Sequence, residues 1–359
     1  MGIYIVYFFL ILIVPSVCSF LIKNRRNAQD VALKILLFLM YLILALKSET
    51  VGSDISGYRE MYVHYGSVPF NDFSYSSMEI GYIFLMKLGN IIGLSFQGFE
   101  AVLYAITIIP MYYFIKRNSC DVMISVLILF CLDFFVFACS GLRQTVAMSM
   151  CVGSFTYLTN KKNSSIHGFN KLILAIIIVG VASFIHRSSL LFIPVLLIVY
   201  YRFKVLTYAL YAVVVLILLF VPHYFININA EYELSKYELD ERLTLGMMFV
   251  FDVIMIVFYY ISIRINKISI DKISTWQFGN VILYGLLLMV VFNGSMILRA
   301  ALYELVFFAI IMPIAIHAWE QSTRRIISFI YVAVMFFCLY FLILKPNTLS
   351  IVPYRFFFS

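Results

Sequence analysis

The chain has 359 residues, of which 64% are apolar and 12% are charged, and its formal net charge is +8. Soluble domains are usually about 45–50% apolar and about 25% charged, so this composition, with a mean hydropathy of +1.00, excludes a soluble catalytic domain, a disordered chain and a disulfide scaffold. A bilayer-spanning helix needs roughly 20 residues, and about twelve of them would use roughly two-thirds of the chain. The sequence therefore predicts an all-α, polytopic integral membrane protein with short loops.

Apolar runs of spanning length follow one another along the chain. They lie at about 3–22, 31–47, 98–115, 122–139, 142–159, 171–186, 187–201, 205–222, 244–264, 276–293, 297–318 and 325–344. The first run follows no basic segment and precedes no small-residue cleavage signal, which predicts a retained span. The six cysteines show no CxxC or Cys/His spacing, so we expect no disulfide, metal site or cofactor.

A shorter run at 79–93 carries Lys87 in its middle, and the basic residues decide its topology. If it does not cross the membrane, six basic clusters between the spans fall on one side, as the positive-inside rule requires. They are Lys23/Arg25/Arg26, Lys116/Arg117, Lys161/Lys162, Arg202/Lys204, Arg264/Lys267/Lys272 and Arg324/Arg325. We therefore expect twelve spans, a re-entrant or interfacial helix at 79–93, and both termini outside. The positive charge is an orientation signal, and nucleic acid is not an expected partner.

The same topology places two longer loops outside, at 48–78 and 222–243. The second is acidic and has the pattern of a short helix. With no internal repeat or linker in the sequence, residues 1–359 are expected to form one membrane domain.

The first two polar motifs lie in and after the first outer loop. Asp54 and Tyr58 are four residues apart, so they share a face of a helical turn, and Gly52 and Gly57 permit bends beside it. Glu79 opens the short amphipathic run, where a carboxylate favours a helix N-terminus. For both acids, a capping role is the alternative to a substrate role.

Arg143 and Gln144 open a span directly after a Ser-Gly bend. An arginine there can extend to lipid headgroups. With its planar fork and permanent charge, it is better explained as a clamp for a diphosphate.

The later motifs are His186-Arg-Ser-Ser189 and Arg299 with Tyr303 and Glu304. The histidine suits acid–base chemistry near neutral pH, although a solvated turn capped by Ser188 is the alternative. Arg299 pairs either with Glu304 or with an anionic ligand. Two further acids inside apolar runs, Asp133 and Asp252, are interpreted mainly as helix–helix hydrogen-bonding groups.

These motifs together place carboxylates, one histidine and two arginines at the outer face. An anionic ligand with a lipid tail and a polar outer part requires this combination.

In this order the motifs resemble those of the EpsG/Wzy-type bacterial polysaccharide (O-antigen) polymerases. They are GxDxxxY (Gly52, Asp54, Tyr58), ExGY (Glu79, Gly81, Tyr82), SGxRQxxA (Ser140, Gly141, Arg143, Gln144, Ala147) and HxSS (His186, Ser188, Ser189), with a looser likeness at Arg299–Tyr303 and Pro353–Phe358. The resemblance covers residues 48–200 well and 295–359 more loosely.

The resemblance implies a GT-C-like, metal-independent, inverting glycosyltransferase of the bacterial inner membrane, active at the periplasmic face. It would join oligosaccharide repeat units carried on undecaprenyl diphosphate into O-antigen, the polysaccharide part of lipopolysaccharide, or into a similar polysaccharide. Membrane lipid, a chain-length regulator and a flippase are the implied partners.

Under this hypothesis Arg143 and Arg299 bind the diphosphate, and His186, Asp54 or Glu79 is the base. The first two are favoured over Glu79. Further substrate contacts are expected from Gln144, Tyr58, Tyr82, Ser188, Tyr303 and Arg355. The alternatives are a flippase or transporter, disfavoured because no sequence repeat is present, an O-antigen ligase, and an acyltransferase, whose HxxxxD pattern is missing after His186.

Overall fold

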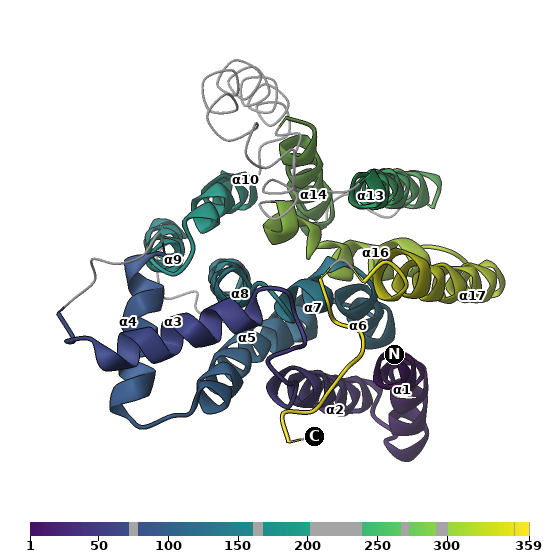
Figure 1. The fold of residues 1–359 in the computed structure, drawn as a ribbon. Helices are drawn as coiled ribbons and strands as arrows, with labels where there is room; N and C mark the ends of the chain where they lie inside the picture. The colour runs from purple at the N-terminus through teal and green to yellow at the C-terminus, as the bar shows by residue number, and fades with distance from the viewer. Residues whose placement is uncertain are drawn as a thin grey trace.

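A computed structural model describes residues 1–71, 78–160, 168–201, 239–266, 273–291, 301–347 and 349–358, and the described part is a bundle of helices (Figure 1). Most helices are seen nearly end-on in this view, whereas α3 runs across it. In chain order the helices are α1 (Gly2–Leu21), α2 (Arg25–Ala45), α3 (Ile55–Ser67), α4 (Ile80–Ile91), α5 (Phe96–Asn118), α6 (Val122–Cys131), α7 (Asp133–Ala138), α8 (Leu142–Leu158), α9 (Gly168–Ser183), the 3-10 helix η2 (Arg187–Phe192), α10 (Ile193–Tyr201), α13 (Leu239–Ile265), α14 (Ile273–Val291), α16 (Phe308–His317), α17 (Gln321–Phe337) and the π-helical η3 (Cys338–Leu344).

Polar caps explain where several apolar helices begin. The side chains of Asn24, Ser95 and Asp121 accept hydrogen bonds from backbone N–H groups in the first turns of α2, α5 and α6. Such caps satisfy N–H groups that have no partner within the helix. Because of the Asn24 cap, α2 begins at Arg25, six residues before the apolar run at 31–47.

Four helices in the described part are long and apolar enough to cross a bilayer. They are Gly2–Leu21, Arg25–Ala45, Phe96–Asn118 and Gln321–Leu344, and shorter apolar helices lie at Ile80–Ile91, Val122–Cys131, Gly168–Ser183, Arg187–Tyr201, Gln277–Leu288 and Ala301–His317. The prediction of an all-helical, multi-pass membrane protein is thus confirmed in its coarse form. The number of twelve spans and the GT-C-like arrangement stay predictions.

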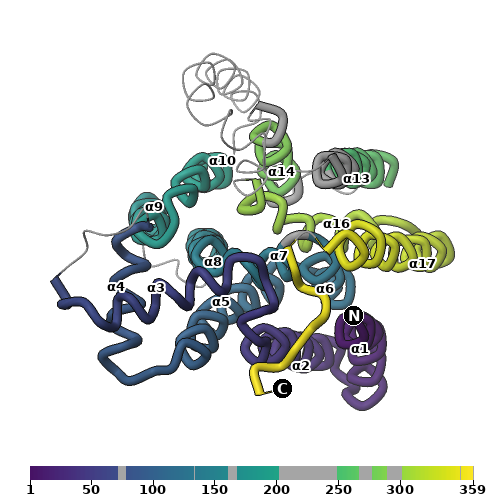
Figure 2. The backbone as a smooth tube through the Cα atoms, viewed as in Figure 1, coloured from purple at the N-terminus to yellow at the C-terminus, as the bar shows by residue number. Residues whose placement is uncertain are grey.

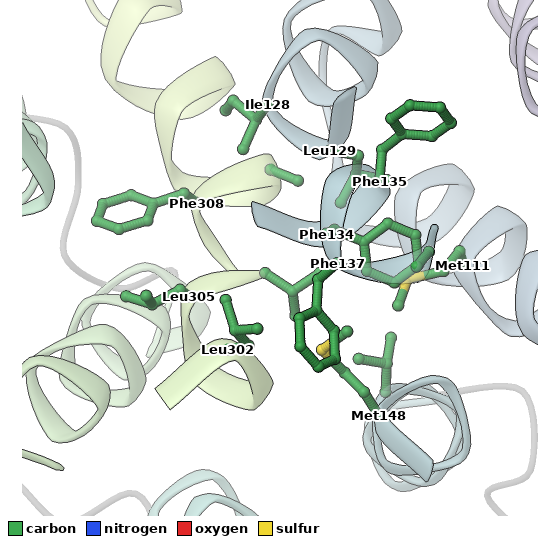
Figure 3. Close-up of a cluster of buried hydrophobic side chains, with 14 of the residues drawn as sticks. Met111, Ile128, Leu129, Phe134, Phe135, Phe137, Met148, Leu302, Leu305 and Phe308 are labelled. Carbon is green, nitrogen blue, oxygen red and sulfur yellow. The ribbon is translucent and has the colours of Figure 1, made fainter. Parts of the chain in front are cut away.

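Two predicted spans are interrupted, which corrects the sequence analysis. The run at 122–139 breaks at Leu132, whose backbone is extended, so that α6 is ten residues long and α7 six. Of the run at 297–318, the structure describes the residues from 301 onward, and the chain turns at 306–307, before α16 begins. Figure 3 shows α7 and the helical turn before α16 facing each other across a cluster of buried apolar side chains. A run of apolar residues predicts burial, but it does not reveal a change of direction between buried segments.

A cavity of about 20 Å³ lies between the two breaks, lined by apolar side chains and by Asp252. Asp252 is buried in this position, and its expected role as a helix–helix hydrogen-bonding group stays a prediction. The side chain of Asp133 lies outside the described residues.

The run at 79–93 forms the short helix α4, which packs on α3. At 12 residues, it spans about 18 Å, less than the roughly 30 Å of a hydrocarbon core. The Asn90 side chain donates to the Tyr62 backbone oxygen of α3 at 3.0 Å. Lys87, the charge inside this run, donates to the Pro69 backbone oxygen at 2.6 Å, under the Tyr65 ring. A helix of this length, with a buried lysine held by the preceding segment, fits the interfacial position expected for it.

The two outer loops differ from the expectation. Residues 48–78 contain the 13-residue helix α3, so the Asp54–Tyr58 turn is the start of a longer helix. In the second loop, residues 239–243 already belong to α13. The span at 205–222 and most of the loop at 222–243 lie outside the described residues.

Both termini lie at the same end of the bundle. The Tyr4 hydroxyl near the start of α1 donates to the Ile351 backbone oxygen at 2.7 Å, and Figure 2 shows the C-terminal segment crossing the bundle toward the end of α2. At the other end, Lys116 pairs with Asp30 at 2.8 Å, close to the basic turn between α1 and α2. The positive-inside rule predicts that this basic end is cytoplasmic. We therefore call it the cytoplasmic end, and we call the end with the termini, α3 and α4 the outer end.

Candidate functional site

Glu79 is the centre of a polar cluster at the outer end of the bundle. It precedes α4, yet its side chain makes no capping hydrogen bond to that helix. Its Oε2 atom instead lies 2.5 Å from Nη1 of Arg143, in the first turn of α8. The two side chains are only 11% and 22% exposed, so this pair is shielded from water more than an ordinary surface ion pair.

The second carboxylate oxygen of Glu79 faces the segment after α9. Oε1 accepts a hydrogen bond from the Arg187 backbone N–H at 3.2 Å and lies 3.3 Å from Nδ1 of His186. The ring nitrogen lies close to the carboxylate but makes no well-aligned hydrogen bond to it. One carboxylate therefore joins three segments that are far apart in the sequence.

A glycine brings α4 this close to the end of α9. The Gly81 N–H donates to the Phe184 backbone oxygen at 2.8 Å. A Cβ atom on Gly81 would lie 2.6 Å from that oxygen, so no larger residue fits without a shift. The ExGY motif therefore needs its glycine because the acid has to reach His186 and Arg143.

The surroundings of Glu79 set its protonation state. Burial alone raises the pKa of this carboxyl group, but the His186 ring, the Arg187 N–H and the charge of Arg143 outweigh burial and lower the pKa from 4.5 to about 2. Glu79 is consequently ionised at every physiological pH and is a weak proton acceptor. Glu79 lies where it can orient Arg143 and His186, and which of the three candidate residues is the base stays a prediction.

Tyr58 contacts the Arg143 guanidinium, and Tyr82 packs against Tyr58. The Nε atom of Arg143 donates to the Tyr58 hydroxyl at 3.3 Å, and its guanidinium carbon lies 5.7 Å from the Tyr58 ring centre. The Tyr58 and Tyr82 rings meet edge to face at 5.6 Å. These contacts hold the Arg143 side chain against α3 and α4.

Ser188 and Tyr303 bring a later part of the chain to the same end. The Ser188 hydroxyl donates to the Tyr303 hydroxyl at 3.2 Å, and η2 has no side-chain cap, so the capping alternative for Ser188 is wrong. Glu304, the next residue, is fully buried, and neither of its carboxylate oxygens has a hydrogen-bond partner in the described part of the chain. Its predicted partner Arg299 lies outside the described residues.

Asp54 lies at the start of α3, next to the turn before α8. Its carboxylate makes no capping bond; it accepts from the Ser53 hydroxyl at 3.0 Å. The Asp54 N–H donates to the Ser140 hydroxyl at 3.2 Å, and the Ser53 and Ser140 hydroxyls are 2.8 Å apart. Four residues on, Tyr58 contacts Arg143, so α3 connects Asp54 to the cluster around Glu79.

The structure does not bring every predicted site residue together. Gln144 is buried in α8, and the Arg355 side chain is exposed, while the Arg355 backbone oxygen accepts from the Ser48 N–H at 2.8 Å. The sequence analysis missed one buried ion pair, Lys47 with Glu100, 3.0 Å apart and fully buried. Each residue stands at the edge of an apolar run, and nothing in the pattern pairs them.

Among the described residues, no group of three His, Cys, Asp or Glu side chains is arranged to hold a metal ion. The polar cluster offers a guanidinium, an imidazole, hydroxyl groups and carboxylates. This set can bind an anion and transfer a proton.

Comparison with known families adds one finding. The model of the EpsG family matches residues 30–356. No curated protein and no solved structure matches the chain.

Proposed function

The chain belongs to the EpsG family, which is associated with exopolysaccharide synthesis, and from this premise we propose that it is a glycosyltransferase that polymerises lipid-linked oligosaccharides. Its substrates would be repeat units on undecaprenyl diphosphate, joined at the outer face of a bacterial inner membrane. Product, lipid carrier and location are part of the proposal.

The observation that carries this proposal is the shared carboxylate of Glu79. It brings Arg143 within 2.5 Å on one side and His186 within 3.3 Å on the other. A fixed cation beside an imidazole is what a reaction needs when it expels a diphosphate and removes a proton from a hydroxyl group. The cluster lies at the outer end of the bundle. A nucleotide sugar would be supplied at the opposite, cytoplasmic end.

Arg143 would hold the donor diphosphate. Its Nη1 and Nε atoms contact Glu79 and Tyr58, which fixes the plane of the guanidinium and leaves the Nη2 hydrogens for phosphate oxygens. A fixed arginine stabilises the charge that grows on the leaving diphosphate without having to reorient.

His186 would act as the general base. The Glu79 carboxylate faces Nδ1, so Nε2 would accept the proton of the acceptor hydroxyl. As that proton leaves, the hydroxyl oxygen attacks the anomeric carbon and the bond from this carbon to the diphosphate oxygen breaks. The electron pair of that bond stays with the diphosphate. One such displacement inverts the anomeric centre.

The test is complementation of a strain in which the gene is deleted, with the surface glycan read on a gel. The wild-type gene should restore a ladder of repeat lengths. Arg143→Ala, expressed at the same level, should leave one capped repeat unit. A ladder with Arg143→Ala would contradict the role of Arg143.

The deletion strain itself separates the competing functions. A polymerase deletion leaves single repeats on the surface. Loss of even the single repeat would favour a flippase or a ligase and would overturn the polymerase proposal. A chain-length regulator and a flippase are expected to work with this protein, and copurification from the same membranes would test them.

A further inference from the structure

The C-terminal segment 349–357, which we call the strap, lies along the loop 46–53 that leads into the site. Four backbone hydrogen bonds join them. Ser48 N donates to Arg355 O at 2.8 Å, Phe357 N to Leu46 O at 3.0 Å, Gly52 N to Ser350 O at 3.1 Å, and Ser53 N to Leu349 O at 3.0 Å. Figures 1 and 2 show the strap passing in front of α6 and α7 to reach the end of α2.

The strap is itself anchored on the bundle by two tyrosines. Tyr4 in α1 donates to the Ile351 backbone oxygen at 2.7 Å, and the Tyr354 hydroxyl donates to the Ile43 backbone oxygen in α2 at 2.9 Å. Ile351 is only 1% exposed. The strap is thus a packed part of the outer end and not a loose tail.

The loop packs against the turn that carries Ser140. Gly52 has a φ angle of +109°, and a Cβ atom there would collide with the Cys139 backbone oxygen. Next to it, Ser53 and Asp54 both contact the Ser140 hydroxyl. The loop therefore lies between the strap and the start of α8. In the loop, Gly52 is two residues before Asp54; on the other side of the contact, Ser140 is three residues before Arg143.

A buried ion pair holds the start of the same loop. Lys47 pairs with Glu100 of α5 at 3.0 Å, with both side chains fully buried, and its backbone bridges to Phe356 of the strap. Buried ion pairs add little net stability, and specifying one arrangement is the better-attested reason to retain them. Here the pair sets where the loop leaves α2.

We infer that the strap is a positioning element of the site, which holds Asp54 in place for a hydroxyl group of the acceptor sugar. This inference rests on the proposed function. Glu79 contacts Arg143 and His186 directly, whereas the strap reaches Arg143 only indirectly, through the Ser140 turn and through Tyr58 of α3. Loosening the strap should therefore weaken substrate binding more than it slows the chemical step.

Because the strap acts through its backbone, proline is the informative substitution. Phe357→Pro removes the N–H that binds Leu46, and Phe358→Pro, one residue beyond the strap, is the matched control. One backbone hydrogen bond is worth about 0.5–1.5 kcal/mol, so Phe357→Pro should raise KM for extracted lipid-linked repeat units by about two- to tenfold. The kcat value should change less than KM.

A second measurement works without catalysis. Ile351→Cys places a buried thiol within the strap, and a membrane-impermeant maleimide applied from outside should label it slowly. Adding Phe357→Pro should speed this labelling several-fold, whereas Phe358→Pro should not.

The labelling tests whether the strap opens, and the KM value tests whether the site responds. Unchanged labelling together with unchanged KM would overturn the inference. Faster labelling with unchanged KM would show that the strap opens without moving the site, and would also overturn it. If the Ile351→Cys variants label as expected but the wild-type protein forms no polymer from the repeat units, the proposed function fails instead.

Discussion

The two ends of the bundle each combine an acid, a histidine and an arginine, and they use the three side chains differently. At the cytoplasmic end the His317 imidazole lies between its partners, with Nε2 2.9 Å from Asp121 Oδ2 and Nδ1 3.3 Å from Arg324 Nη1. At the outer end the acid lies between the other two, so that Glu79 faces both Arg143 and His186.

This difference decides which histidine has a nitrogen left for a substrate. Both ring nitrogens of His317 are occupied, and Arg324 is further fixed by two contacts to the Trp319 backbone oxygen at 3.2 and 3.0 Å. Nε2 of His186 makes no hydrogen bond to the described residues. The same residue types thus form a hydrogen-bonded link between helices at one end and a candidate reactive site at the other.

The largest expected effect comes from exchanging each histidine. His186→Ala should lower polymerisation by about 10²–10⁴-fold, the usual contribution of a general base. His317→Ala should leave the rate per folded molecule within about threefold, because a link between helices affects stability instead. Rates measured on purified protein, normalised to the folded fraction, test the pair. Equal losses in both variants would contradict the distinction between the two ends.

Replacing Arg143 by lysine tests whether the planar fork matters in addition to the charge. Lysine keeps the charge but cannot contact Glu79 and a phosphate in the same fixed plane, so we expect about a tenfold loss of kcat/KM, or roughly 1.4 kcal/mol of transition-state stabilisation. Arg324→Lys at the other end is the control and should not affect kcat/KM. Full activity of Arg143→Lys would show that Arg143 contributes its positive charge and that the planar fork is not needed.

Glu79→Gln removes the negative charge and keeps the shape of the side chain. If Glu79 orients its neighbours, activity should fall by about tenfold but not vanish. A loss as large as that of His186→Ala would instead make Glu79 the base.

The pH dependence of stability sharpens the same point. The Glu79 pKa is lowered from 4.5 to about 2, so its ionised form contributes stability that is fully present above about pH 4.5 and is lost as the pH falls toward 2. The difference in thermal midpoint between wild type and Glu79→Gln should therefore stay constant from pH 5 to 8. A difference that shrinks near pH 6 would mean that Glu79 titrates in that range.

The smallest effect is expected from Asp121. Its side chain caps α6 and holds His317, so Asp121→Ala should lower stability by about 1 kcal/mol, as other lost N-caps do. Thermal unfolding in detergent measures it, with activity per folded molecule as the control. A loss of activity without a loss of stability would assign this end a functional role.

Local patterns in the sequence predicted most of the helices and the end of the bundle where the motifs lie. Apolar runs give helices such as α1 and α5 within a few residues, because length and hydropathy suffice for them. The breaks at Leu132 and at 306–307 were missed because the runs around them are mostly apolar, and the single acid near each break, Asp133 or Glu304, does not by itself end a helix.

Long-range pairing explains what else was missed. The motifs containing Glu79, Arg143 and His186 were identified separately, but no spacing along the chain indicates that one carboxylate joins the other two. The pair of Lys47 and Glu100, 53 positions apart, depends likewise on how α2 packs on α5. The predicted side-chain role of Arg355 came from its place in a motif, whereas the structure engages its backbone.

The short helices behind the site have a consequence for the surrounding lipid. With 17 residues in α8 and 16 in α9, these helices reach about 26 and 24 Å, below the roughly 30 Å of an average hydrocarbon core. Such hydrophobic mismatch is relieved when the bilayer thins around the protein. Under the proposed function, thinning next to α9 would lower the headgroup plane toward His186, so that a diphosphate carried on a polyprenyl chain would meet the site without rising out of its leaflet.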